Sequence, residues 1–339
     1  MIFMKKENVS ELRQDIVSGD WVVIATGRMI RPDEFLKTKR HPPTQSKNEC
    51  SFEVLSPSSL LFYSSDDNHR REDWWVQVVE NKYPAFGKGV CEVRDQVGPY
   101  RWKDGVGFHE VVITRDHTRP FALMSLPEVE LVLRAFQERY LNLKTIPCIE
   151  YISIFQNHGV SSGASIAHPH SQITAIPVVP PDVGRSIKGS SVYFHEHNAC
   201  VHCAVIEYEV NAKERIIYEN EYMIVIAPFA SKSAFEMRIF PKKHSARFEL
   251  TVLKERFALA DVLRTALGKL YHGLNNPDYN FFLHTAPVGE SAEYTHYHWH
   301  FEILPKTAIW AGFEIGTGIE ISVIAPEAAA KFLRDVNPV

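Results

Sequence analysis

The strongest constraint on the fold is that the second half of the chain repeats the order of features found in the first half. Each half carries three histidines in the same order, a single one followed, at nearly the same spacing, by a His-x-His pair. They are His117, His168 and His170 in the first half and His244, His298 and His300 in the second. A repeat of this kind indicates two copies of one unit, each burying its own apolar face.

The predicted strands and helices also follow one order in both copies. An apolar strand that ends in Glu-Asn-x-Tyr opens each copy, at 80–83 and again at 219–222. The helix of the first copy begins with a Ser-x-x-Glu capping box at Ser125. The predicted strands are 75–83, 108–115, 149–155, 173–179, 215–222, 234–240, 279–283 and 301–304, and the helices are 125–144, 251–274 and a short terminal one at 326–336.

The chain is therefore predicted to be an α+β protein of two tandem domains, each an antiparallel sheet with packed helices. Its 339 residues are enough for two cores of roughly 150 residues each. The segment 180–191 (PPDVGRSIKGSS) is rich in proline, glycine and serine and is predicted to be the linker. We expect domains at 1–185 and 186–339.

Charge and hydropathy exclude several classes of partner. The chain has 37 basic and 41 acidic residues, which argues against a nucleic-acid binder that works through bulk positive charge. An apolar run of roughly 20 residues, which a membrane span needs, is absent, and residues 1–9 lack the apolar core of a signal peptide. A cytoplasmic location is expected, and there the Cys-x-x-C pair Cys200 and Cys203 indicates metal or redox chemistry rather than a disulfide framework. Cys91 and Cys148 have no partner signature, and buried packing is expected for Cys148.

The first His-x-His pair is the best candidate for a reactive site. Residues i and i+2 of a strand point to the same face, so His168 and His170 can approach one site together. Such a pair is often no more than two satisfied histidines. Here it follows a glycine–serine loop, 157–165 (NHGVSSGAS), whose backbone amides can cradle a phosphate, and this context favours phosphate chemistry.

The residues around this pair resemble a known motif. The run His-Pro-His-Ser-Gln at 168–172, preceded by Phe-Gln-Asn-x-Gly at 155–159 and Gly-x-Ser at 163–165, resembles the active-site motif of the galactose-1-phosphate uridylyltransferases, which belong to the histidine-triad superfamily. Further matching segments are 19–24, Arg28, 31–32, 81–84 and 311–314. The resemblance implies two fused histidine-triad-like domains, in agreement with the repeat.

The resemblance also implies roles for individual residues. His170 would attack the α-phosphorus of a nucleotide sugar and carry the nucleotidyl group until a second phosphate acceptor removes it. Gln172 would hydrogen-bond the phosphoryl oxygens, and Ser165 with the loop amides would bind the leaving phosphate. The implied substrate contacts are Arg28, Arg31, Asn81, Asn157, Gly163 and Gln172. The implied partners are a nucleotide sugar, a sugar 1-phosphate and a second copy of the chain as a homodimer.

The same resemblance implies a structural zinc site in the first half, and the repeat-equivalent positions of the second half predict another. The C-terminal set is Cys200, Cys203, His244 and His298, a closed set of two thiolates and two imidazoles. The N-terminal set is Cys50, Glu53, His117 and His168, in which Glu53 stands where the family has a second cysteine, and the alternative is a lost site. Some relatives instead place iron among histidines that here are His284, His298 and His300, but Asp182 is only near the expected carboxylate position. We expect zinc, and we expect His300 to be a relic or a structural histidine.

Three alternatives concern the reaction. His158, Ser171 and the run 316–318 are more similar to the branch that includes ADP-glucose phosphorylase, which leaves the nucleobase and the acceptor open. A hydrolase is the second alternative, but its motif carries a third histidine where this chain has Gln172. The third is a zinc-stabilised binding module without catalysis, against which the intact 168–172 motif argues.

Overall fold

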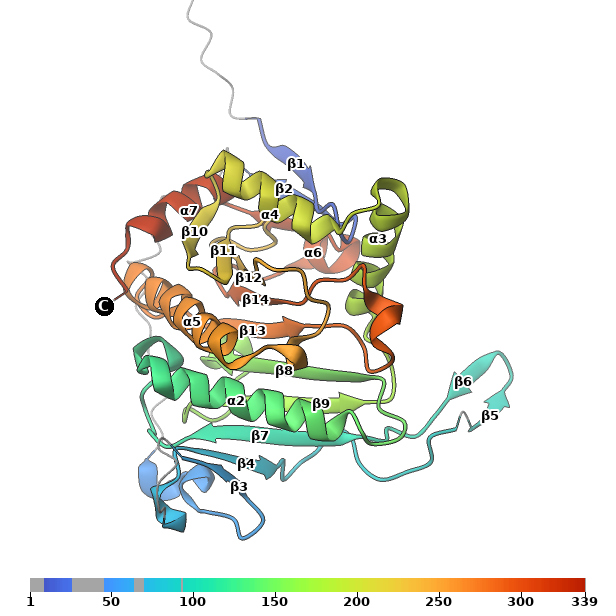
Figure 1. Ribbon diagram of the computed structural model, residues 1–339, viewed down its shortest axis with the longest axis vertical. Helices are drawn as coiled ribbons and strands as arrows, with labels where there is room; N and C mark the ends of the chain where they lie inside the picture. The colour runs from blue at the N-terminus through green and yellow to red at the C-terminus, as the bar shows by residue number, and fades with distance from the viewer. Residues whose placement is uncertain (1–8, 26–45, 64–69, 93, 339) are drawn as a thin grey trace, which may run out of the picture.

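The two repeats form one continuous sheet in the computed structural model, which describes residues 9–25, 46–63, 70–92 and 94–338. The ten strands lie in the order β10-β11-β12-β14-β13-β8-β9-β7-β4-β3 (Figure 1). Their bounds are β3 Leu60–Phe62, β4 Val76–Glu80, β7 Phe108–Thr114, β8 Tyr151–His158, β9 His170–Ile176, β10 Ile216–Glu219, β11 Met223–Ile226, β12 Met237–Pro241, β13 Tyr279–His284 and β14 His300–Pro305. The predicted α+β class and its antiparallel sheets are confirmed.

The halves meet at their inner edge strands. β8 of the first half pairs antiparallel with β13 of the second, and Asn157 lies opposite Asn280 across this junction. On either side of the junction the strands follow the same sequence of neighbours, because β8, β9, β7, β4 and β3 correspond in position to β13, β14, β12, β11 and β10. Pairing the two inner edges satisfies backbone groups that two separate sheets would expose.

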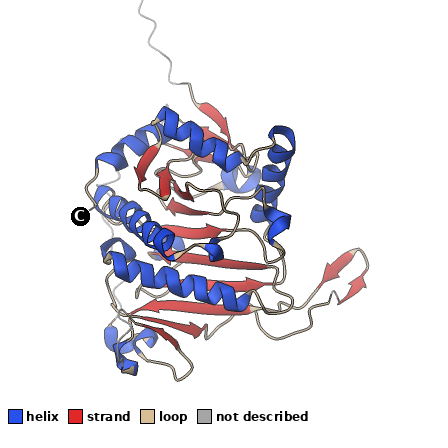
Figure 2. Ribbon diagram, viewed as in Figure 1, coloured by secondary structure: helices blue, strands red, loops and turns tan. Residues whose placement is uncertain are grey.

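Two long helices cover one face of the sheet. α2 (Leu126–Leu143) and α5 (Leu253–Gly273) lie side by side on it (Figure 2). The capping box predicted at Ser125 is present and involves Glu128. The apolar faces of both helices join Ile154, Ile173 and Phe301 of the sheet in one core. Since side chains alternate along a strand, His170 and Gln172 must lie on the opposite face from Ile173.

One detail of the predicted repeat is wrong. The Glu-Asn-x-Tyr run at 80–83 follows β4, whereas the run at 219–222 follows β10. By position β4 corresponds to β11 and β10 to the edge strand β3, so the two runs are not equivalent. The four matching letters are a coincidence of two strand ends.

The segment predicted as a linker is helical. Residues 180–191 form most of α3 (Pro181–His197), with Pro180 as the N-cap and Pro181 in the first turn. Its glycine at 189 serves close packing, because a Cβ there would lie 1.7 Å from the carbonyl oxygen of Val17. A side chain is thus excluded by the neighbouring turn. The boundary at 185/186 remains a prediction and falls within this helix.

The remaining elements lie around the large sheet. β1 (Glu11–Gln14), β2 (Trp21–Ile24) and β15 (Glu320–Ser322) form a three-stranded sheet that joins the N-terminal and C-terminal segments. β5 (Arg94–Val97) and β6 (Tyr100–Trp102) form a hairpin that projects from the body (Figure 1). The other helices are α4 Val201–Ala212, α6 Gly312–Thr317 and α7 Pro326–Asp335, and the 3-10 turns are Lys47–Glu49, Ser51–Glu53, Arg71–Asp73, Phe121–Leu123, Val160–Ser162, Phe248–Leu250 and Ser291–Tyr294.

The structure pairs two cysteines that have no sequence signature. Cys91 and Cys148 form a disulfide bond. Cys148 is half-buried and has a φ of 75°, so the expectation that it is a buried packing residue is wrong. Among the described helices, none is long and apolar enough to cross a membrane.

Candidate active site and metal centres

His170 begins β9 on the face of the sheet that α2 and α5 leave uncovered. Its Nδ1–H donates a hydrogen bond to the carbonyl oxygen of His168 at 2.8 Å. Because Nδ1 carries the proton, Nε2 presents a lone pair. The side chain is 7% exposed, and burial lowers the pKa of the imidazole, which keeps it neutral. A ring of Phe52 packs edge-on against it at 5.0 Å between centroids. The geometry therefore holds a neutral, nucleophilic imidazole.

Gln172 lies two residues along the same strand and has a partner that sequence reasoning missed. His109 of β7 approaches it, with 2.8 Å between His109 Nε2 and Gln172 Oε1. The third member of this group is Asn81, whose Nδ2 lies 3.2 Å from His109 Nε2. A single histidine in an apolar strand has no motif, and its position follows only from the register of β7 with β9, which places His109 opposite Thr174.

The glycine–serine loop (157–165) connects β8 to β9 and is held by the second half of the chain. The backbone N–H of Ser161 donates to Asp278 Oδ2 at 2.7 Å, and Asn280 Nδ2 donates to the Ser162 carbonyl at 3.0 Å. Asn280 also donates to Asn157 Oδ1 at 2.7 Å. Ser165 is exposed in this loop. Gly163 also lies in this loop, and the remaining two predicted contacts, Arg28 and Arg31, lie outside the described residues.

A glycine in this loop gives a testable consequence. Gly159 has a φ of 83°, and a Cβ there would lie 2.0 Å from Asp278 Oδ1. We expect Gly159→Ala to lower the free energy of unfolding by about 1–3 kcal/mol, through backbone strain and displacement of the Asp278 contact. Denaturant unfolding measures this change.

The matched control is Gly184→Ala in helix α3, where a Cβ would meet nothing within 4 Å. That substitution should be neutral or stabilise the protein by about 0.5–1 kcal/mol, since alanine is the better helix former. Equal effects of the two substitutions would contradict the proposed packing of Gly159 on Asp278.

The predicted C-terminal metal ligands converge in space. Cys203 Sγ lies 3.4 Å from His244 Nδ1 and 3.5 Å from His298 Nδ1, and Cys200 Sγ lies 3.9 Å from His298 Nδ1. Tetrahedral zinc separates bound sulfur and nitrogen atoms by about 3.5 Å. The other ring nitrogens donate to backbone carbonyls, His244 to Thr295 and His298 to Pro241, which turns both Nδ1 lone pairs toward the sulfurs. These four residues fit a closed zinc site.

Three residues of the predicted N-terminal set, Cys50, His117 and His168, converge, and Glu53 lies beside the two histidines. Glu53 Oε1 lies 3.1 Å from His117 Nδ1 and 3.5 Å from His168 Nδ1. Cys50 Sγ lies 3.7 Å from His168 Nδ1, whose Nε2 donates to the Thr114 carbonyl. Cys50, His117 and His168 thus fit three ligands of a metal site, and the Glu53 carboxylate beside the two histidines is the candidate for the fourth.

A third cluster lies where the second half repeats the His170 site. His300 donates from Nδ1 to the His298 carbonyl at 3.1 Å, as His170 does to His168. In contrast to His170, its Nε2 faces a carboxylate, Glu302 Oε1 at 3.4 Å. Buried Arg238 lies 3.2 Å from the same oxygen and, against the effect of burial, holds the pKa of Glu302 well below its usual range. That guanidinium offsets part of the charge of the carboxylate, and His284, His300 and Glu302 form a group that could hold a metal ion.

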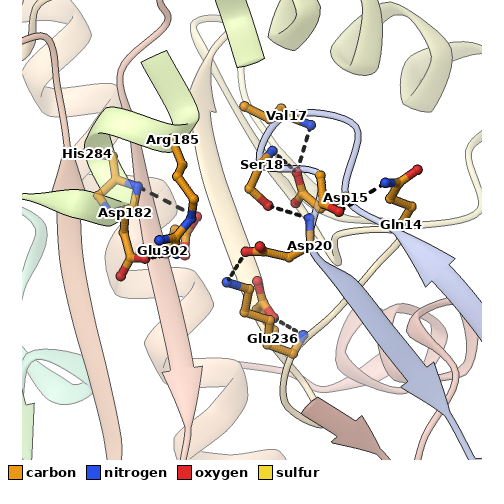
Figure 3. A network of polar contacts seen from close by, with 12 residues as sticks. Gln14, Asp15, Val17, Ser18, Asp20, Asp182, Arg185, Glu236, His284 and Glu302 are labelled. Atoms are coloured by element: carbon orange, nitrogen blue, oxygen red, sulfur yellow. Dashed lines mark hydrogen bonds and ion pairs between the residues drawn. The ribbon is translucent and has the colours of Figure 1, made fainter. Parts of the chain in front are cut away.

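The N-terminal segment covers this third cluster. Arg238 also pairs with Asp15 at 2.9 Å. Asp15 in turn accepts hydrogen bonds from the backbone N–H groups of Val17 and Ser18 in the turn between β1 and β2 (Figure 3). His284 lies beside Glu302, at 3.8 Å, and burial lowers its pKa to about 4. His298 has both ring nitrogens engaged elsewhere, so it does not join this cluster. The expectation that His300 is a relic or a structural histidine remains a prediction.

Known proteins resemble this chain over nearly its whole length. The family model described as "Galactose-1-phosphate uridyl transferase, N-terminal domain" matches residues 2–180, and a domain of unknown function, DUF4921, matches residues 105–335. An ADP-glucose phosphorylase from Arabidopsis thaliana is 34% identical over 98% of this chain and 94% of its own length. A galactose-1-phosphate uridylyltransferase from Thermotoga maritima is 29% identical over 96% of this chain and 98% of its own.

Solved structures also resemble this chain over nearly its whole length. The crystal structure of an ADP-glucose phosphorylase from Arabidopsis thaliana with bound ADP-glucose superposes with a TM-score of 0.80, at 31% identity, over 97% of this chain and all of that one. A uridylyltransferase structure superposes with a TM-score of 0.73 at 26% identity, over 96% of this chain and 97% of that one.

Proposed function

The chain belongs to the galactose-1-phosphate uridylyltransferase family, a family of nucleotidyl-transferring enzymes, and we propose that it transfers the nucleotidyl group through a covalent bond to His170. The observation that carries this proposal is the hydrogen bond from His170 Nδ1 to the His168 carbonyl, which leaves the Nε2 lone pair for attack. Among the described residues His170 lacks the facing carboxylate that its repeat mate His300 has.

The reaction proceeds in two balanced steps. In the first, Nε2 of His170 forms a bond to the α-phosphorus of the nucleotide sugar, and the bond from that phosphorus to the bridging oxygen breaks. The electron pair of the broken bond leaves with the sugar 1-phosphate. In the second, a phosphate oxygen of the acceptor bonds the α-phosphorus, and the electron pair of the P–N bond returns to Nε2.

The surrounding groups stabilise charge as it develops. The adduct places a positive charge on the imidazole, and the His168 carbonyl holds its Nδ1–H throughout. Gln172 donates to the oxygens of the transferred phosphoryl group. The amides of the glycine–serine loop, Ser165 and Asn157 bind the phosphate that leaves.

The proposed donor is ADP-glucose, and the proposed acceptor is a phosphate group, supplied by orthophosphate or by a sugar 1-phosphate. Support comes from the 34% identity to an ADP-glucose phosphorylase and from His158 and Ser171, which are more similar to that branch. The ring of His158 stacks on Tyr279, and its Nε2 is hydrogen-bonded to Asn276 Oδ1. These two contacts hold the side chain at the start of the loop.

Labelling with nucleotide sugars tests this proposal. The purified protein is mixed separately with ADP-glucose and UDP-glucose, each labelled in its α-phosphate, and the protein-bound label is counted. We expect ADP-glucose to label the protein at least about tenfold faster, a difference of about 1.4 kcal/mol in transition-state binding. Release of the label by orthophosphate alone identifies a phosphorylase, and release only by a sugar 1-phosphate identifies an exchange enzyme. Faster labelling by UDP-glucose would overturn the proposed donor.

Two structural zinc ions are part of the proposal. Cys200, Cys203, His244 and His298 would hold one, and Cys50, His117 and His168, with Glu53 as the proposed fourth ligand, would hold the other. When bound, each ion would cross-link segments that are distant in sequence. A homodimer is also proposed on the basis of family membership, and a cytoplasmic location on the basis of the sequence features described above. Sedimentation velocity of the purified chain tests the dimer.

A further inference from the structure

The two carboxamides at the site, Gln172 and Asn157, are both held by their oxygen atoms. Gln172 Oε1 faces His109 Nε2 at 2.8 Å, and Asn157 Oδ1 faces Asn280 Nδ2 at 2.7 Å. Each of these contacts belongs to a short chain of hydrogen bonds that ends on a backbone group. A backbone N–H can only donate and a backbone carbonyl can only accept, so these ends determine the direction of every bond in the chain.

The first chain begins at the backbone N–H of Ala85. It donates to His109 Nδ1 at 3.3 Å, so in the neutral ring the proton lies on Nε2. Nε2–H therefore donates to Gln172 Oε1. The Asn81 amide nitrogen, 3.2 Å from Nε2, makes no hydrogen bond to it in this tautomer, and its Oδ1 accepts from the N–H of Tyr83. The Gln172 NH₂ group is consequently the end left for a ligand.

The second chain ends at the carbonyl oxygen of Ser162. Asn280 Nδ2 donates one hydrogen to that oxygen at 3.0 Å and the other to Asn157 Oδ1. Asn157 and Asn280 are direct partners in the β8–β13 register, so the bond crosses the junction between the two halves. The Asn157 NH₂ group then points into the glycine–serine loop, where a Cβ on Gly163 would lie 3.9 Å from it.

Phosphoryl oxygens only accept hydrogen bonds, so a carboxamide serves them through its NH₂ group and repels them through its oxygen. We propose that His109 and Asn280 are positioning residues that hold the Gln172 and Asn157 amides with both NH₂ groups toward the phosphates of the nucleotide sugar. This inference rests on the proposed function. It gives the second half of the chain a part in catalysis, because Asn280 lies on β13.

Substitutions of different polarity at position 109 test the proposed role of His109. His109→Gln keeps a donor, His109→Ala removes it, and His109→Glu replaces it with an acceptor that would turn the Gln172 amide around. The rate of covalent labelling by ADP-glucose should fall by less than about threefold, by about tenfold and by about a hundredfold, respectively. A merely structural role of His109 would rank the variants by size and not by polarity.

The Gln172→Ala background is the control for added charge. In this background the three substitutions should differ by less than about twofold, because a residue that acts through Gln172 has nothing left to orient. A glutamate that acted directly on the phosphates would keep its full effect.

An isosteric substitution tests the proposed role of Asn280. Asn280→Asp keeps the shape of the side chain but cannot donate to Ser162 or Asn157. We expect labelling to slow by about tenfold or more, and the loss to shrink to less than about threefold in an Asn157→Ala background. Equal losses in both backgrounds would overturn the proposal that Asn280 acts through Asn157.

A binding measurement separates this inference from the proposed function. The affinity for ADP is measured by calorimetry for every variant. If the wild-type protein binds ADP but forms no adduct, covalent transfer fails, and a ranking of ADP affinities by polarity still supports the inference. If the protein forms the adduct and the substitutions do not couple to Gln172 and Asn157, the inference is overturned and the function stands. Absence of binding of both ADP and UDP by the wild-type protein overturns both.

Discussion

His170→Ala is expected to abolish covalent labelling and to lower turnover by at least about a thousandfold, because the substitution removes Nε2, the proposed attacking atom. The fold should survive. His170 lies on the sheet face away from the α2–α5 core, and the hydrogen bond that it makes to the backbone is its own Nδ1–H to His168. Thermal unfolding and single-turnover labelling of the same preparation measure both effects.

The repeat provides the matched control, His300→Ala. His300 has the same backbone hydrogen bond, but its Nε2 lies against Glu302 in a buried cluster with Arg238. Its loss should leave labelling intact and reduce the free energy of unfolding by about 1–3 kcal/mol, since a buried carboxylate loses a partner. Normal exchange in a folded His170→Ala protein, or loss of labelling in His300→Ala, would contradict the assignment of the nucleophile.

Cys203→Ala is expected to remove one zinc per chain and to lower the midpoint of thermal unfolding by about 10 °C or more, because ligands held by a structural zinc contribute several kcal/mol to folding. Cys203 Sγ is near both His244 and His298, so its removal opens the site most. Elemental analysis of the purified variant and a melting curve are the measurements.

The N-terminal set should behave differently. Glu53→Ala should retain the C-terminal zinc and lose any metal of its own site, with a cost to activity before a cost to the fold, because His168 is both a ligand and the acceptor of the His170 hydrogen bond. A harder oxygen ligand in place of a thiolate predicts that this metal leaves first as the pH falls. Zinc retained in Cys203→Ala but lost in Cys50→Ala would reverse the assignment.

The sequence is informative where a local motif has one structural meaning. The His-x-His pairs mark the strands β9 and β14, the capping box marks the start of α2, and the Cys-x-x-C pair lies at the start of α4 with its two histidines nearby. The His-x-His pairs and the capping box involve residues within a few positions of one another, whereas His244 and His298 were matched to the two cysteines through the repeat.

Features that depend on register across the sheet could not be predicted. The β8–β13 junction pairs two edge strands from different copies, and the sequence pattern of either copy alone does not predict this pairing. His109 acts on Gln172 only because β7 lies beside β9. Asn280 contacts Asn157 only because β13 lies beside β8. The same limitation explains the mistaken match of the two Glu-Asn-x-Tyr runs, since four letters at a strand end do not reveal that strand's neighbours.

The helix predicted as a linker shows a second limitation. Proline, glycine and serine at 180–191 are typical of a loop, but two prolines also suit a helix N-terminus, and the glycine at 189 serves a close approach to the Val17 carbonyl. Composition records which residues are present. It does not record which partner requires them.

The covalent intermediate on His170 is the central claim, and mass spectrometry of the wild-type protein tests it most directly. The protein is mixed briefly with ADP-glucose, quenched at alkaline pH to preserve a P–N bond, digested and mapped. The proposed mechanism predicts one adenylyl group per chain, on the peptide that contains His170, and its disappearance when acceptor phosphate is added before the quench. Consumption of ADP-glucose with an unmodified His170, or an adduct on another residue, would contradict it.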